Sequence, residues 1–198
     1  MRIEENQHEK YESLKDQEIW NLISQSDMNA LSYIYNQYYS DLYYFGLKCS
    51  KNEQLSKDCI QDLFIKLWEK REKISIQYTI KSYLITALRR TILDKFAAEK
   101  KIETKNQEVF LENDVSLSVQ DLIIYQEADE SMKKQMETAL QSLTAKQKEI
   151  VYLRFYQEMS YDEIAESLDI KYQSVRNSIY ESMKVLKRLL LVLTLLFA

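Results

Sequence analysis

Glycine and proline are almost absent from this chain, and their absence limits the folds that it can adopt. The 198 residues include one glycine, Gly46, and no proline, where average usage would supply about 14 glycines and about 10 prolines. Proteins rich in β-structure need these two residues at their turns. The sequence therefore predicts an all-α protein, and its length allows one or two small domains.

Composition alone does not exclude an enzyme, but no residues in the sequence are assembled for catalysis. Loops that cradle phosphates or dinucleotides are rich in glycine, and the sequence has no such motif. The single histidine, His8, lies in a polar N-terminal segment, and Cys49 and Cys59 lack the spacing of a zinc site. Reduced cysteines are typical of the cytoplasm. We therefore expect a cytoplasmic, non-enzymatic protein with no metal, no cofactor and no small-molecule substrate.

Charge varies strongly along the chain. Residues 1–26 carry a net charge of −3, residues 27–100 carry +3, residues 101–131 carry −6 and residues 132–198 carry +2. Two mildly basic blocks therefore flank an acidic connector, whose apolar residues predict short docking segments. The organisation expected from these shifts is a tail or helix at 1–23, a helical domain at 24–100, the connector at 101–131 and a second helical domain at 132–198.

Neither end of the chain predicts a membrane segment. Residues 1–20 lack the apolar core of a signal peptide. Residues 189–198 form an apolar run about half as long as a bilayer span requires. We expect this run to be the buried end of the last helix or a contact for a partner, with a membrane anchor as the weaker alternative.

Capping residues predict where helices begin in the first basic block. Asp27 is a favourable first cap, and it precedes a long segment in which apolar residues recur at helical spacing. Ser50 and Glu53 have the spacing of a capping box, which predicts the start of the next helix. These signals place two consecutive helices in this block.

The second of these helices contains "CIQDLFIKLWEKREKI", residues 59–74. Phe64 and Trp68 lie on its apolar face, whereas Ile65 lies among polar residues on the opposite face. A single exposed isoleucine usually has no function. An apolar side chain surrounded by carboxylates can equally be half of a protein contact, so both interpretations stay open on this evidence.

A loop is expected after Arg71, followed by a helix through "TIKSYLITALRRTILDKFAAEKK", residues 79–101. Basic and aromatic side chains alternate in this segment. Proteins that bind single-stranded nucleic acid use such residues, because cations contact phosphates and rings stack on bases. Aromatic residues at helical spacing more often belong to a core, and this alternative also stays open.

The second basic block predicts a helix-turn-helix within residues 143–190. Thr144 with Gln147 and Ser160 with Glu163 form two capping boxes. Asp169 can adopt the positive φ that the turn between two steeply crossing helices requires. The residues at the start of the last helix that can reach base edges or phosphates are Lys171, Tyr172, Gln173, Ser174, Arg176, Asn177 and Tyr180. A three-helix module for protein contacts is the alternative.

Together these segments resemble the extracytoplasmic-function group of bacterial RNA polymerase sigma factors, in the sigma-70 family, over roughly residues 24–197. "DCIQDLFIKLWEKR", residues 58–71, resembles the signature helix of sigma region 2. "YTIKSYLITALRRTILDKF", residues 78–96, resembles the helix that melts and reads the minus-ten promoter element. Residues 143–189 resemble region 4, which reads the minus-thirty-five element. The chain departs from the family pattern at Glu181, where a frequent arginine and its phosphate contact are missing.

The resemblance implies a sigma factor that binds core RNA polymerase and promoter DNA and that an anti-sigma factor controls. The implied polymerase contacts, on the clamp coiled coil of the largest subunit, are Asp58, Gln61, Asp62, Ile65, Lys66 and Glu69. The implied minus-ten contacts are Tyr78, Lys81, Tyr83, Arg89, Arg90 and Lys95. The implied minus-thirty-five contacts are the seven residues from Lys171 to Tyr180 named above.

Two other functions are compatible with the residues alone. The first is a helix-turn-helix transcriptional regulator that acts without polymerase binding and uses its N-terminal block for a ligand or for dimerisation. The second is a helical adaptor that touches no nucleic acid. Capture of core polymerase by the purified protein separates all three functions.

Overall fold

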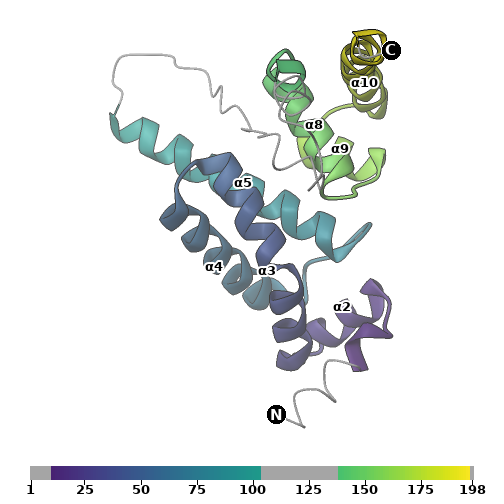
Figure 1. The fold of residues 1–198 in the computed structure, drawn as a ribbon. Helices are drawn as coiled ribbons and strands as arrows, with labels where there is room; N and C mark the ends of the chain where they lie inside the picture. The colour runs from purple at the N-terminus through teal and green to yellow at the C-terminus, as the bar shows by residue number, and fades with distance from the viewer. Residues whose placement is uncertain (1–9, 104–137, 197–198) are drawn as a thin grey trace. The chain divides into compact units, whose positions relative to one another are not determined.

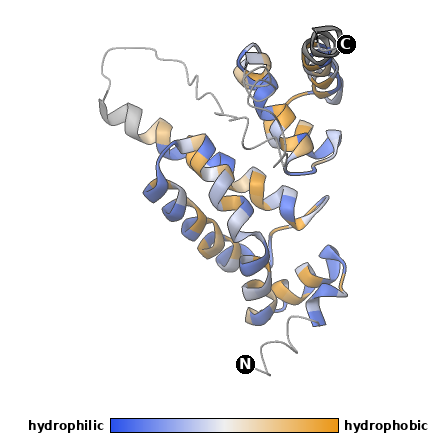
Figure 2. Cartoon of the chain, in the orientation of Figure 1, coloured by the Kyte–Doolittle hydropathy of each residue, from blue (hydrophilic) through white to orange (hydrophobic). Residues whose placement is uncertain are grey.

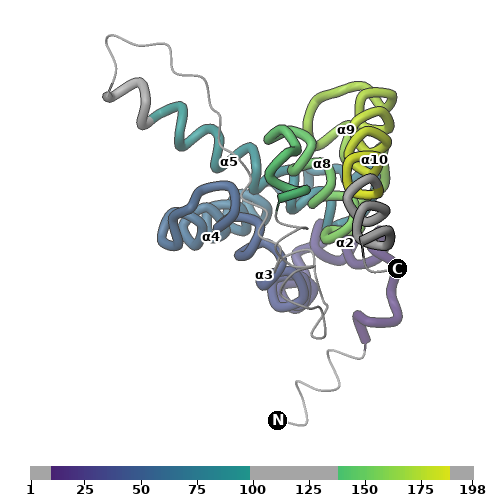
Figure 3. The backbone as a smooth tube through the Cα atoms, turned by 45° about the horizontal axis from the view of Figure 1, so that its top comes forward, coloured from purple at the N-terminus to yellow at the C-terminus, as the bar shows by residue number. Residues whose placement is uncertain are grey.

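The computed structural model describes residues 10–103 and 138–196, with side chains described for 10–98 and 138–187. All regular structure in these residues is helical, which confirms the all-α prediction. The helices form two compact units, one within residues 1–108 and one within residues 109–198. Figures 1 and 3 trace the helices of each unit along the chain. The acidic connector lies outside the described residues, apart from its first three, which continue a helix.

The described part of the first unit contains helices α2, α3, α4 and α5 in close succession. Helices α3, α4 and α5 pack against one another, and α2 packs against α3. Each of these helices carries both polar and apolar residues, as expected for helices with one buried face (Figure 2). Their bounds are Asp16–Ser24 for α2, Met28–Ser50 for α3, Glu53–Lys70 for α4 and Ile80–Glu103 for α5.

Asp27 caps α3 as predicted, because its carboxylate accepts hydrogen bonds from the backbone N–H groups of Asn29 and Ala30. The capping box predicted for Ser50 and Glu53 is wrong. Ser50 is the last residue of α3, and the cap of α4 is Asn52. The reason is that α3 runs on to Ser50, so α4 starts at Glu53 and that residue is too early in the helix to complete a box.

The chain's single glycine, Gly46, lies at a close contact between α3 and α4. A Cβ atom at Gly46 would lie 3.2 Å from the Cβ of Ser56 on α4. The Ser56 hydroxyl is fully buried and hydrogen-bonds to that of Ser50 at 2.8 Å. Gly46 and Ser56 are both small, and α3 and α4 can therefore pack tightly against each other.

The second unit contains α8, α9 and α10, which contact one another in all three pairs. The capping boxes of Thr144 and Ser160 are both present, and Asp169 adopts φ 52° and ψ 52° in the turn after α9. These observations confirm the predicted helix-turn-helix, with Val175 and Ile179 buried on the inner side of α10. The bounds are Ala145–Phe155 for α8, Tyr161–Leu168 for α9 and Tyr172–Leu196 for α10.

Candidate protein-docking and nucleic-acid interfaces

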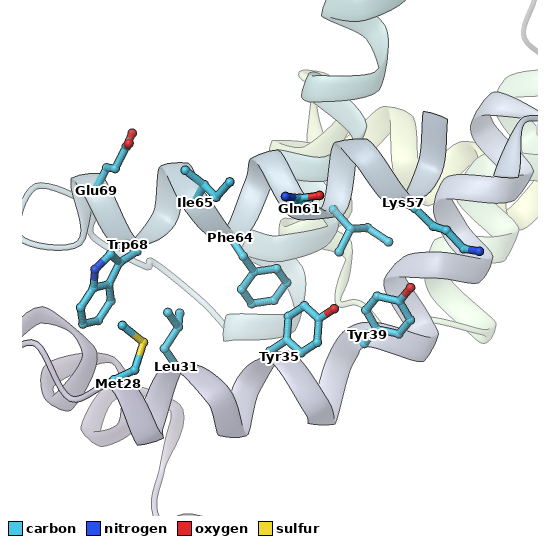
Figure 4. Close-up of a pocket in the computed structure, with 11 residues that line it drawn as sticks. Met28, Leu31, Tyr35, Tyr39, Lys57, Gln61, Phe64, Ile65, Trp68 and Glu69 are labelled. Carbon is cyan, nitrogen blue, oxygen red and sulfur yellow. The ribbon is translucent and has the colours of Figure 1, made fainter. Parts of the chain in front are cut away.

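The outer face of α4 displays Ile65 to solvent. The side chain is 48% exposed, which confirms its assignment to the polar side of the helix. Phe64 and Trp68 point toward α3, whereas Glu69 points away from it (Figure 4). An exposed aliphatic side chain flanked by polar groups has the composition of a protein contact.

A groove between α3 and α4 adjoins this face. The groove has a volume of about 580 Å³, and Tyr35 is one of the residues that line it. The ring of Tyr35 lies edge-on to that of Phe64, with the two centroids 5.0 Å apart. Trp68 lies half-buried at one end, with the Arg71 guanidinium stacked 4.5 Å from its ring. The residues that line the groove are Met28, Leu31, Tyr35, Tyr39, Lys57, Ile60, Gln61, Phe64, Ile65, Trp68 and Glu69.

The contribution of α3 to this groove was missed by the sequence reasoning. Met28 is 54% exposed and Tyr35 39% exposed, although Tyr35 follows the same spacing as the buried Leu42 of that helix. The rings of Tyr35 and Tyr39, one turn apart, are tilted by 39° to each other, with centroids 5.2 Å apart. The only sequence signal for this part of the groove was the recurrence of tyrosines at helical spacing. Residues buried in a helix core recur at the same spacing, so the two cases could not be distinguished.

Two of the acidic residues near Ile65, Asp62 and Asp58, have partners within the chain. Asp62 forms an ion pair with Lys95 of α5 at 2.8 Å, and Asp58 accepts a hydrogen bond from the Gln54 amide at 2.8 Å. The bond to Asp62 raises the pKa of the Lys95 ammonium above its ordinary value. Asp62, a predicted polymerase contact, and Lys95, a predicted minus-ten contact, therefore form an ion pair with each other.

The six predicted minus-ten residues lie in different environments. Lys81 is paired with Asp41 of α3 at 2.9 Å. Tyr83 is half-buried, and its ring lies 5.5 Å from that of Trp20. Burial raises the pKa of the Tyr83 hydroxyl, an effect that the Arg90 cation partly offsets. Tyr78, which is 40% exposed, and Arg90 are the most accessible of the six, whereas Arg89 and Lys95 are partly covered.

The predicted minus-thirty-five residues, in contrast, share one exposed surface. All seven, from Lys171 to Tyr180, are exposed at the start of α10. Tyr180 is 66% exposed, and the Gln173 amide donates a hydrogen bond to the side-chain oxygen of Asn177 at 2.9 Å. This arrangement leaves a polar helix face available to a DNA groove. Which of these residues contact DNA stays a prediction.

The described residues lack the features of two other classes of site. No group of three or more histidine, cysteine, aspartate or glutamate side chains among them could hold a metal ion. Within the same residues, no helix has the length and apolar character of a membrane span. Cys59 is buried, and burial raises the pKa of its thiol, which makes it less reactive.

Family models match both units. A model of Sigma-70 region 2 matches residues 34–102, and a model of Sigma-70, region 4 matches residues 133–186. The chain belongs to the sigma-70 family. The matched segments contain α4, α5 and the helix-turn-helix, and so include every candidate contact in this sigma factor. Helix α2 lies before the first matched segment.

Curated relatives place this sigma factor in the extracytoplasmic-function group. It is 24% identical to RNA polymerase sigma factor SigV of Bacillus subtilis over 147 residues, which are 74% of this chain and 82% of SigV. It is 23% identical to ECF RNA polymerase sigma factor SigX of the same organism over 156 residues, 78% of this chain and 80% of SigX.

Solved structures share the fold of this sigma factor. One is the sigma factor RpoE in complex with the anti-sigma factor NepR from Bartonella quintana, with a TM-score of 0.54 and 21% identity over 80% of this chain and 94% of that one. Another is CnrH in complex with the cytosolic domain of CnrY, with a TM-score of 0.57 and 15% identity over 88% of this chain and 96% of that one.

Proposed function

We propose that this sigma factor binds core RNA polymerase through its first unit and directs it to promoters that both units recognise. The observation that carries the proposal is the presence, in one chain, of an exposed isoleucine on the polar face of α4 and an exposed recognition surface at the start of α10. A free-standing regulator needs only the second of these surfaces. The two surfaces lie in segments that match sigma regions 2 and 4.

The chemistry of the α4 face indicates the kind of polymerase surface that it fits. Ile65 supplies an apolar contact, and Asp58, Asp62 and Glu69 surround it with carboxylates. Interfaces gain most of their binding energy from a few central side chains enclosed by a polar rim. We therefore expect a partner with an apolar centre and basic side chains around it, and we assign this role to the clamp coiled coil of the polymerase.

The exposed face of α10 fits the major groove of the upstream promoter element. A guanidinium such as that of Arg176 can pair with guanine, and an amide such as that of Asn177 can pair with adenine. In the first unit, Tyr78 offers an accessible ring for an unpaired base of the melted strand. The second unit thus recognises duplex DNA, and the first unit recognises single-stranded DNA.

The remaining assignments follow from this function. We expect a non-enzymatic protein that works in the cytoplasm, where polymerase meets the chromosome. The solved relatives RpoE and CnrH are bound to the anti-sigma factor NepR and to the cytosolic domain of CnrY. By analogy, we propose that an anti-sigma factor also controls this chain.

Gel-shift titration near physiological salt, with and without core polymerase, tests the proposal. Non-specific DNA affinity depends on the number of phosphates that Lys and Arg neutralise, and the whole chain carries a net charge of −4. We expect weak binding of a promoter duplex by the protein alone and tight, sequence-specific binding when core polymerase is added. Tight, specific binding without polymerase would favour the helix-turn-helix regulator instead.

A further inference from the structure

Helix α2 holds the loop that carries Tyr78. This α4–α5 loop comprises residues 71–79, and hydrogen bonds tie both of its ends to α2 or to the turn that follows α2. At its start, the Arg71 guanidinium donates to the Ser26 hydroxyl at 2.9 and 3.0 Å. Just beyond its end, the backbone N–H of Ile80 donates to the Asp16 carboxylate at 2.6 Å.

The middle of the loop is held by the same helix. The Trp20 indole N–H donates to the backbone oxygen of Ile74 at 3.1 Å. Trp20 is only 3% exposed and Ile76 only 6% exposed, so burial anchors the loop as well. The ring of Trp20 also lies 5.5 Å from that of Tyr83 on α5. The backbone of the loop is therefore fixed by contacts with a helix far away in sequence.

Apart from the buried Ile76, the side chains from residue 75 to residue 79 face solvent. Ser75, Gln77, Tyr78 and Thr79 are exposed, and the Gln77 amide lies 3.4 Å from the Tyr78 hydroxyl. A fixed backbone that displays hydrogen-bonding groups beside one aromatic ring has the chemistry needed to hold a single unstacked base. Fixing the backbone beforehand reduces the conformational entropy lost on binding.

We propose that Asp16 and Trp20 are positioning residues for strand capture, acting through the backbone of the α4–α5 loop. The inference rests on the proposed function, because it takes the loop to contact the melted promoter strand. It goes beyond the family comparison, because both residues precede the matched segment that begins at residue 34. A purely structural role for α2, through its buried Ile19 and Ile23, is the alternative.

Four variants of the full chain separate these roles. Asp16→Ala removes the acceptor of the Ile80 N–H, and Trp20→Phe removes the donor to the Ile74 oxygen. Asp16→Asn keeps a side-chain oxygen that can accept, so it is the rescue variant. Ile23→Val trims the core of α2 without removing a hydrogen bond to the loop, so it controls for a general loss of stability.

The first measurement is amide hydrogen exchange of the free protein, which does not depend on DNA or polymerase. In Asp16→Ala we expect exchange at Ile80 to rise about fivefold, the factor that one hydrogen bond of typical net strength supports. In Trp20→Phe we expect the loop amides from residue 75 to 78 to exchange faster. Asp16→Asn and Ile23→Val should leave these amides near their original rates. Unchanged exchange in Asp16→Ala and Trp20→Phe would overturn the inference, whatever the protein's function.

The second measurement is base preference in the complex with core polymerase. The probes are single-stranded promoter oligonucleotides in which each position is varied in turn. We expect Asp16→Ala and Trp20→Phe to lower the preference for the favoured base by about fivefold at one position, while Asp16→Asn and Ile23→Val retain it. Equal preference in all variants would overturn the inference. A wild-type complex without any base preference would instead contradict the proposed strand capture, and that result is visible before any variant is compared.

Discussion

The two candidate DNA-binding surfaces of this sigma factor are built in different ways. On α10, all seven predicted contacts are exposed residues of one short stretch of chain. In the first unit, Lys81 and Lys95 are paired with carboxylates of other helices, and Tyr83 packs against Trp20. Residues on the α10 surface can be substituted without changing the core of the second unit. The predicted minus-ten residues, in contrast, also contribute to the packing of the first unit. The four predictions below test this contrast and the proposed polymerase contact, from the largest expected effect to the smallest.

Replacing Ile65 with Lys should have the largest effect. Central interface residues often contribute about 2 kcal/mol or more, so we expect core polymerase binding to weaken about thirtyfold or more. The melting temperature should hardly change, because the side chain is 48% exposed. Tyr44→Lys is the matched control, since Tyr44 is 49% exposed and does not line the groove. Unfolding of Ile65→Lys, or equal polymerase binding by both variants, would show that this face has another role.

Replacing Arg176 with Ala tests base reading by the exposed surface. A side-chain contact to a base edge discriminates by about 1–3 kcal/mol, whereas a phosphate contact strengthens binding to every sequence. We expect selectivity to relax at one or two upstream positions in a promoter library transcribed by the polymerase complex. Lys184→Ala, an exposed cation farther along α10, is the control. A uniform loss at all positions would make Arg176 a phosphate contact.

A pair of tyrosine substitutions compares the stability of the two surfaces directly. Tyr83→Ala removes a half-buried ring that packs against Trp20, and it should lower the free energy of unfolding by about 1–2 kcal/mol. Tyr180→Ala removes a ring that is 66% exposed, and it should change stability by less than about 0.5 kcal/mol. Denaturant titration monitored by circular dichroism measures both values. Equal destabilisation by the two substitutions would remove the contrast between the surfaces.

The ion pair between Asp62 and Lys95 should give the smallest effect. A double-mutant cycle with Asp62→Asn and Lys95→Met should yield a coupling of about 0.2–1 kcal/mol that decreases with added salt. Because Asp62 raises the pKa of Lys95 above its ordinary 10.5, this stabilisation is present at neutral pH. It is lost as the pH rises through the raised value, when Lys95 loses its charge. A coupling that persists unchanged above that pH would have to come from another contact.

The second unit was the more predictable from sequence. Its capping boxes at Thr144 and Ser160, its turn at Asp169 and the outward face of α10 were all expected and are all present. Each of these features depends on residues within about one or two helical turns of each other, where spacing alone decides which side chains meet. The capping box predicted at Ser50 was wrong although it also rests on neighbouring residues. The length of the preceding helix decides which of several candidate residues becomes the cap.

Sequence alone determined the all-α class, the helix-turn-helix and the exposure of Ile65, because glycine and proline content and helical periodicity act locally. Only the tertiary structure decided the groove between α3 and α4 and the pairing of Asp62 with Lys95. The same is true of the hydrogen bond from Ile80 to Asp16, because these two residues are 64 positions apart in the sequence. Contacts of this kind depend on how helices cross and which small residues, such as Gly46, let them approach. Hydrophobic spacing records which face of a helix is buried, but not which other helix covers it.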